Sequence, residues 1–122
     1  MIDIIKTEKY YASLTADQIC DCCYCSNYVS KVKEAYPELA AYLKAQGIDI
    51  EKPYETVPLE PYDGHITYAG VQYLVLGDSM DYVPVKIGDT DIVIADSYPY
   101  TDLADEHFVI EISPIILSWQ EK

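Results

Sequence analysis

All the cysteines of the chain lie within one short run, in the pattern C-x-C-C-x-C. They are Cys20, Cys22, Cys23 and Cys25, and they form two overlapping C-x-x-C pairs. Thiolate sulfur is a ligand for zinc or Cu(I), and it is also the nucleophile of thiol–disulfide exchange. A cysteine can equally serve as a small buried apolar side chain. Three interpretations of the cluster are therefore open: a metal site, a redox site and core packing.

A metal site would need ligands beyond this cluster. Structural zinc sites use four ligands, which usually come from two well-separated pairs. On a helix, Cys20 and Cys23 would project to the side opposite the other two thiols. A zinc site would therefore require a second chain, or His65 or His107. Zinc is the cofactor that this interpretation names, and Cys20 and Cys23 are its first candidate ligands.

The redox interpretation rests on the run CCYC, which is superficially similar to the C-P-Y-C of glutaredoxins. Such a pair works at the start of a helix, where the helix dipole lowers the thiol pKa. The sequence favours an earlier helix start, because Thr15-Ala-Asp-Gln18 has the form of a capping box. A strongly negative chain also disfavours a thiolate. The sequence around the cysteines therefore argues against a redox role for the cluster.

The element that carries the cysteines is expected to be a helix over residues 15–46. Pro37 predicts a kink in this helix or the start of a second helix, and Gly47 predicts the end of the helical segment. Apolar residues recur at steps of three or four, as on one helix face, and form a stripe: Ile19, Cys22, Cys25, Val29, Val32, Tyr36, Leu39 and Leu43. This stripe predicts that Cys22 and Cys25 belong to the core. It leaves Cys20 and Cys23 on the polar side of the helix, where we would look for any chemistry.

The second half of the sequence has the period of β-strands. Ile92 to Ala95 is apolar on both faces, which predicts a central strand, and Gly70 marks a bulge or turn. These patterns predict an α+β fold in a single domain over residues 1–122, with a kinked helix or two helices packed on a mainly antiparallel sheet. Strands are expected at 54–59, 65–76, 82–87, 90–95 and 108–113, with a further N-terminal strand considered at 2–13.

The charge is strongly negative and unevenly distributed. The chain has 21 acidic residues and 8 lysines, for a net charge of −13. Residues 1–50 hold seven acids and five lysines, a net of −2, and residues 51–122 hold fourteen acids and three lysines, a net of −11. This balance argues against binding to nucleic acid or to an anionic membrane. A basic protein partner, a cation or simple solubility remain open.

The longest predicted connection, DSYPYTDLADE, is the candidate binding surface. Its candidate residues are Tyr98, Tyr100, Asp102, Asp105 and Glu106. The chain also has 13 tyrosines, a residue type that suits half-buried sheets and binding surfaces.

These features lead to one hypothesis and one alternative. The hypothesis is a non-enzymatic interaction domain that binds a basic protein partner, such as the toxin of an immunity pair or a cationic regulator. The alternative is a zinc-binding or thiol-redox protein that uses the cysteine cluster. Clustered thiols favour a reducing compartment, so a cytoplasmic location is expected. The oligomeric state is left open.

Two stretches of the sequence resemble a known family. Ile19 to Pro53 contains the run C-x-C-C-Y-C-x-N-Y, then YPEL, then G-[IV]-D-I-x-K-P, and HFVIEISPI follows near the end. This combination is similar to a family of small acidic uncharacterised bacterial proteins with an N-terminal C-x-C-C-Y-C-x-N-Y motif. The resemblance implies no activity and assigns no role to any residue.

Overall fold

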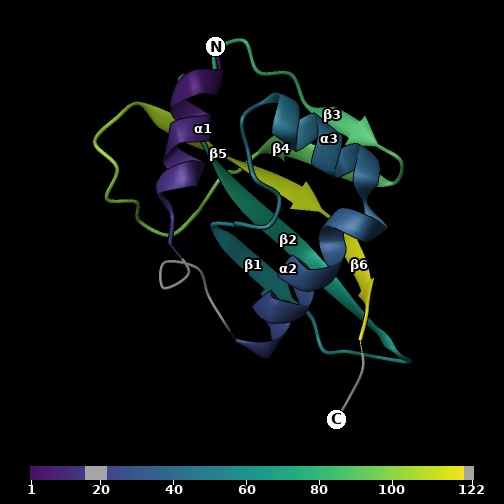
Figure 1. The fold of residues 1–122 in the computed structure, drawn as a ribbon. Coiled ribbons are helices and arrows are strands. Elements are labelled where there is room, and N and C mark those ends of the chain that lie inside the picture. The colour runs from purple at the N-terminus through teal and green to yellow at the C-terminus, as the bar shows by residue number, and fades with distance from the viewer. Residues whose placement is uncertain (16–21, 120–122) are drawn as a thin grey trace.

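The structure is a computed structural model that describes residues 1–15 and 22–119. Three helices and a six-stranded antiparallel sheet make up this part of the chain, which confirms the α+β prediction (Figure 1). None of the helices in these two ranges is long and apolar enough to cross a membrane. The elements are α1 (Ile4–Ser13), α2 (Cys23–Ala35), α3 (Pro37–Ala45), β1 (Glu55–Pro58), β2 (His65–Leu76), β3 (Val85–Ile87), β4 (Thr90–Ile94), β5 (His107–Ser113) and β6 (Ile115–Ser118).

The sheet is organised around β2, its longest strand. The strand order is β1-β2-β5-β4-β3, and β6 pairs with the first part of β2. Along the other edge of β2, Val57 pairs with Gly70 and Pro58 pairs with Tyr68, so Ala69 is an extra residue between them. The sequence predicted a bulge or turn at Gly70, and the register shift confirms a bulge. β6 was not predicted as a separate strand.

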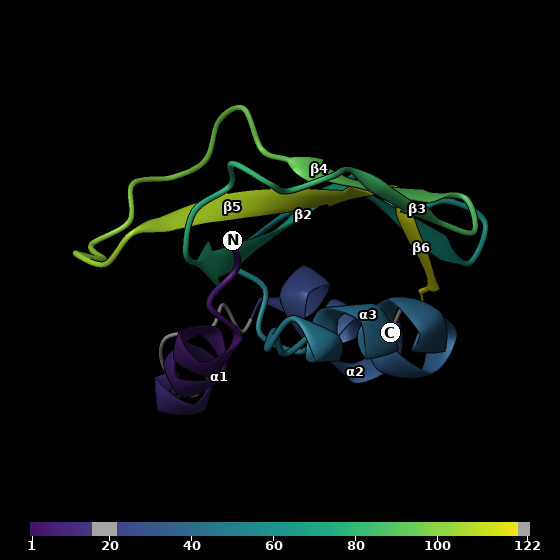
Figure 2. The same ribbon diagram turned by 90° about the horizontal axis from the view of Figure 1, so that it is seen from above.

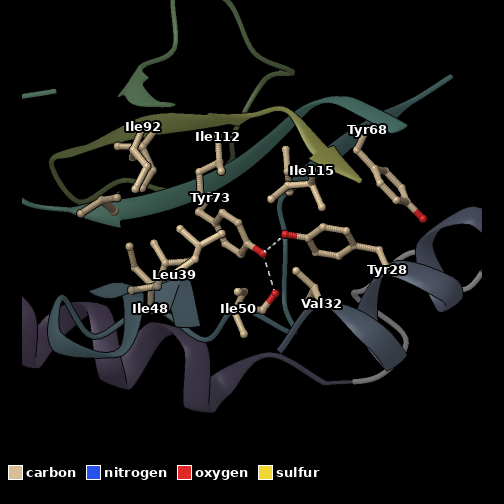
Figure 3. Close-up of a cluster of buried hydrophobic side chains, with 14 of the residues drawn as sticks. Tyr28, Val32, Leu39, Ile48, Ile50, Tyr68, Tyr73, Ile92, Ile112 and Ile115 are labelled. Atoms are coloured by element: carbon tan, nitrogen blue, oxygen red, sulfur yellow. Dashed lines mark hydrogen bonds between the residues drawn. The ribbon is translucent and has the colours of Figure 1, made fainter. Parts of the chain in front are cut away.

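All three helices lie on one face of the sheet (Figure 2). The connection between β4 and β5 arches over the opposite face, which we call the open face (Figure 2). The core therefore lies between the helices and the sheet, and Figure 3 shows part of it. Within the core, Tyr28 donates to the hydroxyl of Tyr73 at 2.6 Å, and Tyr73 donates to the carbonyl of Ile50 at 2.5 Å.

The predicted break at Pro37 is confirmed as the start of a separate helix. Tyr36 closes α2 and precedes the proline at the first position of α3, where its missing N–H is not needed. Gly47 follows the end of α3 with φ of +86°, and a Cβ there would lie 2.7 Å from the carbonyl oxygen of Ile4. The predicted end at Gly47 is therefore also confirmed. The predicted cap around residues 15–18 falls largely in 16–21, outside the described residues.

The strand considered at residues 2–13 is wrong, because residues 4–13 form α1. Asp3 caps this helix, and its carboxylate accepts a hydrogen bond from the Lys6 amide at 3.0 Å. Thr7 and Tyr11, one helical turn apart, are the buried positions. The Tyr11 hydroxyl donates to the carbonyl of Leu74 at 2.7 Å and fixes α1 against β2.

The prediction that Ile92 to Ala95 forms a central strand is confirmed, although the strand is not fully buried. β4 does lie inside the sheet, between β5 and β3. Ile92 and Ala95 are buried, whereas Val93 and Ile94 are each 38 % exposed. Successive side chains of a strand point to opposite faces, so Val93 and Ile94 show that both faces are partly in contact with water at this end of β4.

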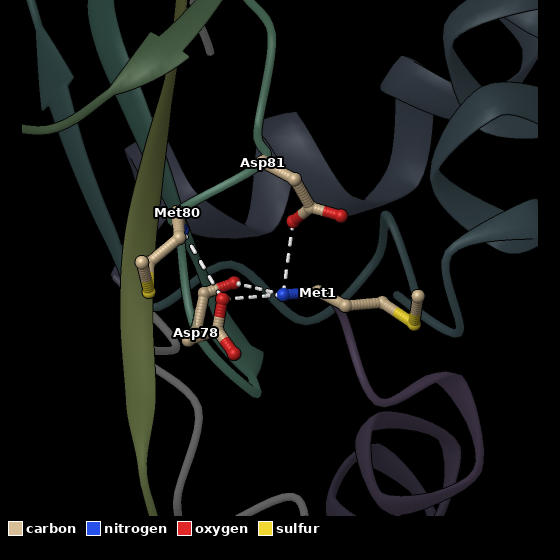
Figure 4. Close-up of polar contacts among 4 residues, drawn as sticks. All are labelled: Met1, Asp78, Met80 and Asp81. Atoms are coloured by element: carbon tan, nitrogen blue, oxygen red, sulfur yellow. Dashed lines mark hydrogen bonds and ion pairs between the residues drawn. The ribbon is translucent and has the colours of Figure 1, made fainter.

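The N-terminus is held at the end of β2, as Figure 4 shows. The Met1 ammonium contacts the carboxylates of Asp78 and Asp81, the latter at 2.9 Å. These contacts raise the pKa of the ammonium group and lower the pKa of Asp78. Gly77 has φ of +115°, and a Cβ there would come within 2.4 Å of the Met1 carbonyl oxygen. Only glycine permits this close approach.

Candidate functional site

The first half of the β4–β5 connection is fastened to the open face of the sheet. The side-chain amide of Gln72 donates a hydrogen bond to the carbonyl of Ser97 at 2.8 Å. The Tyr54 hydroxyl is 2.9 Å from the carbonyl oxygen of Pro99 and 2.7 Å from that of Tyr100. Tyr54 and Gln72 are themselves joined by a backbone hydrogen bond of 2.7 Å. This part of the connection therefore has a defined course.

The second half of the connection is held at its junction with β5. His107 Nδ1 lies 2.7 Å from the carbonyl oxygen of Asp105, which can only accept, so Nδ1 carries the ring proton. In the neutral ring, Nε2 then accepts from the hydroxyl of Thr101 at 2.7 Å. The carbonyl of Glu106 accepts from the Gly77 amide at 2.9 Å. The connection is thus fastened at both ends.

The predicted binding residues all lie on this fastened connection and reach solvent. Tyr98 is 41 % exposed and Tyr100 is 88 % exposed. Asp102, Asp105 and Glu106 are exposed as well. Within residues 1–15 and 22–119, none of these three carboxylates lies within ion-pair distance of a lysine. We call these five residues the acidic loop surface.

A pocket of about 520 Å³ lies between the acidic loop surface and α1. The residues that line it include Tyr10, Tyr54 and Tyr100, together with Leu74 and Asp102. These residues come from separate segments of the chain, so no local sequence pattern could place them together. The excess of tyrosine was the only sequence signal, and it did not identify Tyr10 or Tyr54.

The residues that line the pocket include one acidic residue, Asp102, and one lysine, Lys52. Burial raises the pKa of the Tyr54 hydroxyl, and the neighbouring Tyr10 and Asp102 raise it further because they too are acidic groups. Lys52 also lines the pocket, but its ammonium group donates to the carbonyl of Tyr11 at 2.7 Å. The charges of Asp102 and Lys52 therefore offset each other among the residues that line the pocket, and the uncompensated negative charge lies on the exposed part of the loop.

Hydrogen-bond acceptors continue from the loop onto the open face of the sheet. The strand register places Gln72 between Glu55 and Glu111. Gln72 is only 5 % exposed, and its Nε2 also donates to Glu111 Oε1 at 3.1 Å. Its Oε1 atom is buried and has no hydrogen-bond partner among the described residues. This row therefore places two carboxylates next to the loop, on either side of a buried amide.

Of the described cysteines, Cys22 and Cys23 lie where α2 begins, and Cys25 contacts Thr56 of β1. Cys22 and Cys23 are exposed, and Cys25 is buried. The prediction that Cys25 belongs to the core is confirmed, and the same prediction for Cys22 is wrong. The physical reason is that α2 begins at Cys23, so Cys22 is its N-cap with an extended backbone. It therefore leaves the buried face that continues through Tyr28 and Val32.

The structure does not test zinc binding by Cys20 and Cys23, the first candidate pair of ligands. Cys20 lies outside the described residues, so the geometry of Cys20 with Cys23 is not part of the structure. Within the described ranges, no group of three or more cysteine, histidine or acidic side chains could hold a metal ion. Zinc binding at the cysteine cluster stays a prediction.

Comparison with family models, with curated proteins and with solved structures gives no match to this chain. The resemblance to the family with the C-x-C-C-Y-C-x-N-Y motif therefore stays a prediction.

Proposed function

We propose that this chain is a non-enzymatic interaction domain that binds a basic protein partner through the acidic loop surface and the neighbouring pocket. An immunity protein that neutralises a cationic toxin, or a regulator of a basic protein, would have this chemistry. The partner would present lysine and arginine side chains to the loop.

One observation carries the proposal: the loop is fastened to the sheet while its charged and aromatic side chains face solvent. Tyr54, Gln72 and His107 hold its backbone through the contacts described above. A surface that is ordered before binding loses less conformational entropy when a partner docks. A mobile acidic segment that served only solubility would not need these anchors.

The residue types of the surface suit basic side chains. A lysine or arginine can stack on the exposed ring of Tyr100 through a cation–π contact and reach Asp102 at the pocket wall. Asp105 and Glu106, which are exposed on the loop outside the pocket, would attract the partner over a longer range and accelerate association. Tyrosine is also enriched at protein interfaces, where its ring is buried and its hydroxyl stays hydrogen-bonded.

The test measures association with a fluorescent ten-residue peptide of alternating lysine and arginine. The variant Asp102→Asn, Asp105→Asn, Glu106→Gln should slow association about tenfold at low salt, and added salt should reduce this difference. A control with the same net charge carries Glu34→Gln, Glu38→Gln and Glu60→Gln, at exposed positions outside the loop. If the two variants slow association equally, binding follows total charge and the proposed site is wrong.

A further inference from the structure

Cys22 and Cys25 stand one helical turn apart at the N-terminus of α2. Cys22 is the N-cap, and the helix that it caps runs for 13 residues from Cys23. The backbone N–H of Cys25 donates a hydrogen bond to Cys22 Sγ, with an N···S distance of 3.4 Å. The sequence argument against thiol exchange depended on a helix start near Thr15. α2 instead begins at the cysteines, so that objection does not apply.

The position of Cys22 favours a nucleophilic sulfur. The N-terminus of a helix carries a partial positive charge, which stabilises a nearby thiolate. A hydrogen bond from a backbone amide to the sulfur acts in the same direction, because it favours the charged form. Cys22 is also exposed, so its sulfur can reach a disulfide on another molecule.

Cys25 is placed to act second. It is 7 % exposed, and its sulfur lies 3.5 Å from the hydroxyl of Thr56 on β1. An external disulfide therefore has little access to it. Residues three apart at the start of a helix have Cα atoms about 5 Å apart, which is within the range that a disulfide bridges. The buried Cys25 thiol can therefore reach Cys22 Sγ, although a molecule outside the protein cannot reach Cys25.

The thiols also lie close to a tyrosine hydroxyl on the sheet. Burial raises the pKa of Tyr68, and Cys25, Cys22 and Cys23 all raise it further. The Tyr68 hydroxyl donates to the carbonyl of Tyr24, between the cysteines, at 2.5 Å. This contact ties the first turn of α2 to β2, so the dithiol sits on a fixed backbone.

We propose that Cys22 and Cys25 form a dithiol that reduces disulfides by thiol–disulfide exchange. The Cys22 thiolate attacks one sulfur of an external disulfide RS–SR; the S–S bond breaks, a Cys22–SR bond forms, and the departing RS⁻ takes a proton from water. Cys25 then gives its proton to solvent, and its sulfur attacks Cys22 Sγ. The second RS⁻ leaves and a Cys22–Cys25 disulfide remains.

Two electrons pass from the cysteine pair to the substrate, and an external dithiol such as dithiothreitol returns them. This activity is separate from binding at the acidic loop surface and does not rest on it.

The experiment uses the full chain with Cys20→Ser, so that Cys22, Cys23 and Cys25 are the only thiols that can react. The protein is reduced, freed of reductant and mixed with hydroxyethyl disulfide, a neutral probe that the charge of −13 does not repel. Peptide mass spectrometry should find a Cys22–Cys25 disulfide. With Cys25→Ser added, the reaction should stop at a mixed disulfide on Cys22.

Cys23 provides the matched control, because it is an exposed neighbour on the same turn. Cys22→Ser should slow the reaction by about tenfold or more, whereas Cys23→Ser should change it by less than about twofold. Serine is a good N-cap, so Cys22→Ser should keep its helix, which circular dichroism verifies. Equal reactivity of Cys22 and Cys23, or no bond between Cys22 and Cys25 after oxidation, would overturn the proposal.

Discussion

The two faces of the sheet use tyrosine in opposite ways. On the face that the helices cover, Tyr28 and Tyr73 are fully buried and their hydroxyls bond to each other. On the open face, the Tyr54 hydroxyl fastens a loop, and that loop presents Tyr98 and Tyr100 to water. The ring is the same on both faces, and the partners of the hydroxyl differ. The contrast separates tyrosines that specify the fold from tyrosines that are available to a partner.

Charge follows the same division. Within residues 1–15 and 22–119, the buried polar side chains other than tyrosine are the uncharged Thr7, Gln72 and Thr90. The carboxylates of the acidic loop surface stay in solvent, beside a pocket with tyrosine walls. The helix-covered face should therefore determine stability, and the open face should determine binding.

The largest effect is expected from Tyr73→Phe on the covered face. This change leaves both the hydroxyl of Tyr28 and the carbonyl of Ile50 without their partner in a buried site. The free energy of unfolding should fall by about 3 kcal/mol, as measured by urea denaturation. Tyr28→Phe should lower it by only about 1 kcal/mol, because Tyr73 keeps its bond to Ile50. Equal losses from the two variants would contradict the direction of this hydrogen-bond chain.

Alkaline pH should also act through the covered face. Burial raises the pKa of Tyr28 and Tyr73 above the ordinary value. Below about pH 10 both states keep these protons; above it the unfolded chain loses them and the folded chain does not. The free energy of unfolding should then fall by up to about 1.4 kcal/mol per pH unit for each buried tyrosine. Urea titrations across this range should show a shallower fall for Tyr28→Phe, and an unchanged slope would refute the assignment.

Tyr54→Phe should loosen the open face without disturbing the core. The variant loses the hydrogen bonds to the carbonyls of Pro99 and Tyr100, so stability should fall by about 1 kcal/mol. Hydrogen exchange of the amides in residues 97–101 should become faster, while the amides of β2 keep their protection. Tyr62→Phe, at an 84 % exposed position, is the matched control and should change neither quantity.

The smallest effect on stability is expected from removing the loop charges. Asp102→Asn, Asp105→Asn and Glu106→Gln together should leave the free energy of unfolding within about 0.5 kcal/mol of its original value. These carboxylates are exposed and make no ion pair with a lysine in the described ranges. Thermal unfolding measures the change. A large loss of stability would show that the acids serve the fold, which would weaken the case for binding.

Local sequence signals predicted much of the fold. Pro37 and Gly47 act through backbone rules that need no tertiary context, so the helix break and the helix end were correct. The strand at residues 65–76 and the hairpin around Gly88 followed from alternation and turn chemistry. α1 could not be predicted from an apolar stripe because its buried face is only Thr7 and Tyr11.

The candidate sites were predictable only in part. The loop with Tyr98 and Tyr100 could be found because it is a long polar segment between two strands. The pocket could not, since Tyr10 and Tyr54 meet it only after α1 packs on the sheet. The role of Cys22 depended on where α2 begins, and the periodicity of the apolar stripe continues across that point without marking it.

The most direct test of the account is a nuclear magnetic resonance titration of isotope-labelled protein with the lysine–arginine peptide. The account predicts that amide signals of residues 97–106, Tyr10 and Tyr54 shift, that those of α2 and α3 do not, and that salt reverses the shifts. The variant without the three loop carboxylates should lose the shifts, and the Glu34, Glu38 and Glu60 variant should keep them. Shifts spread evenly over the helices, or retained by the loop variant, would contradict the proposed binding surface.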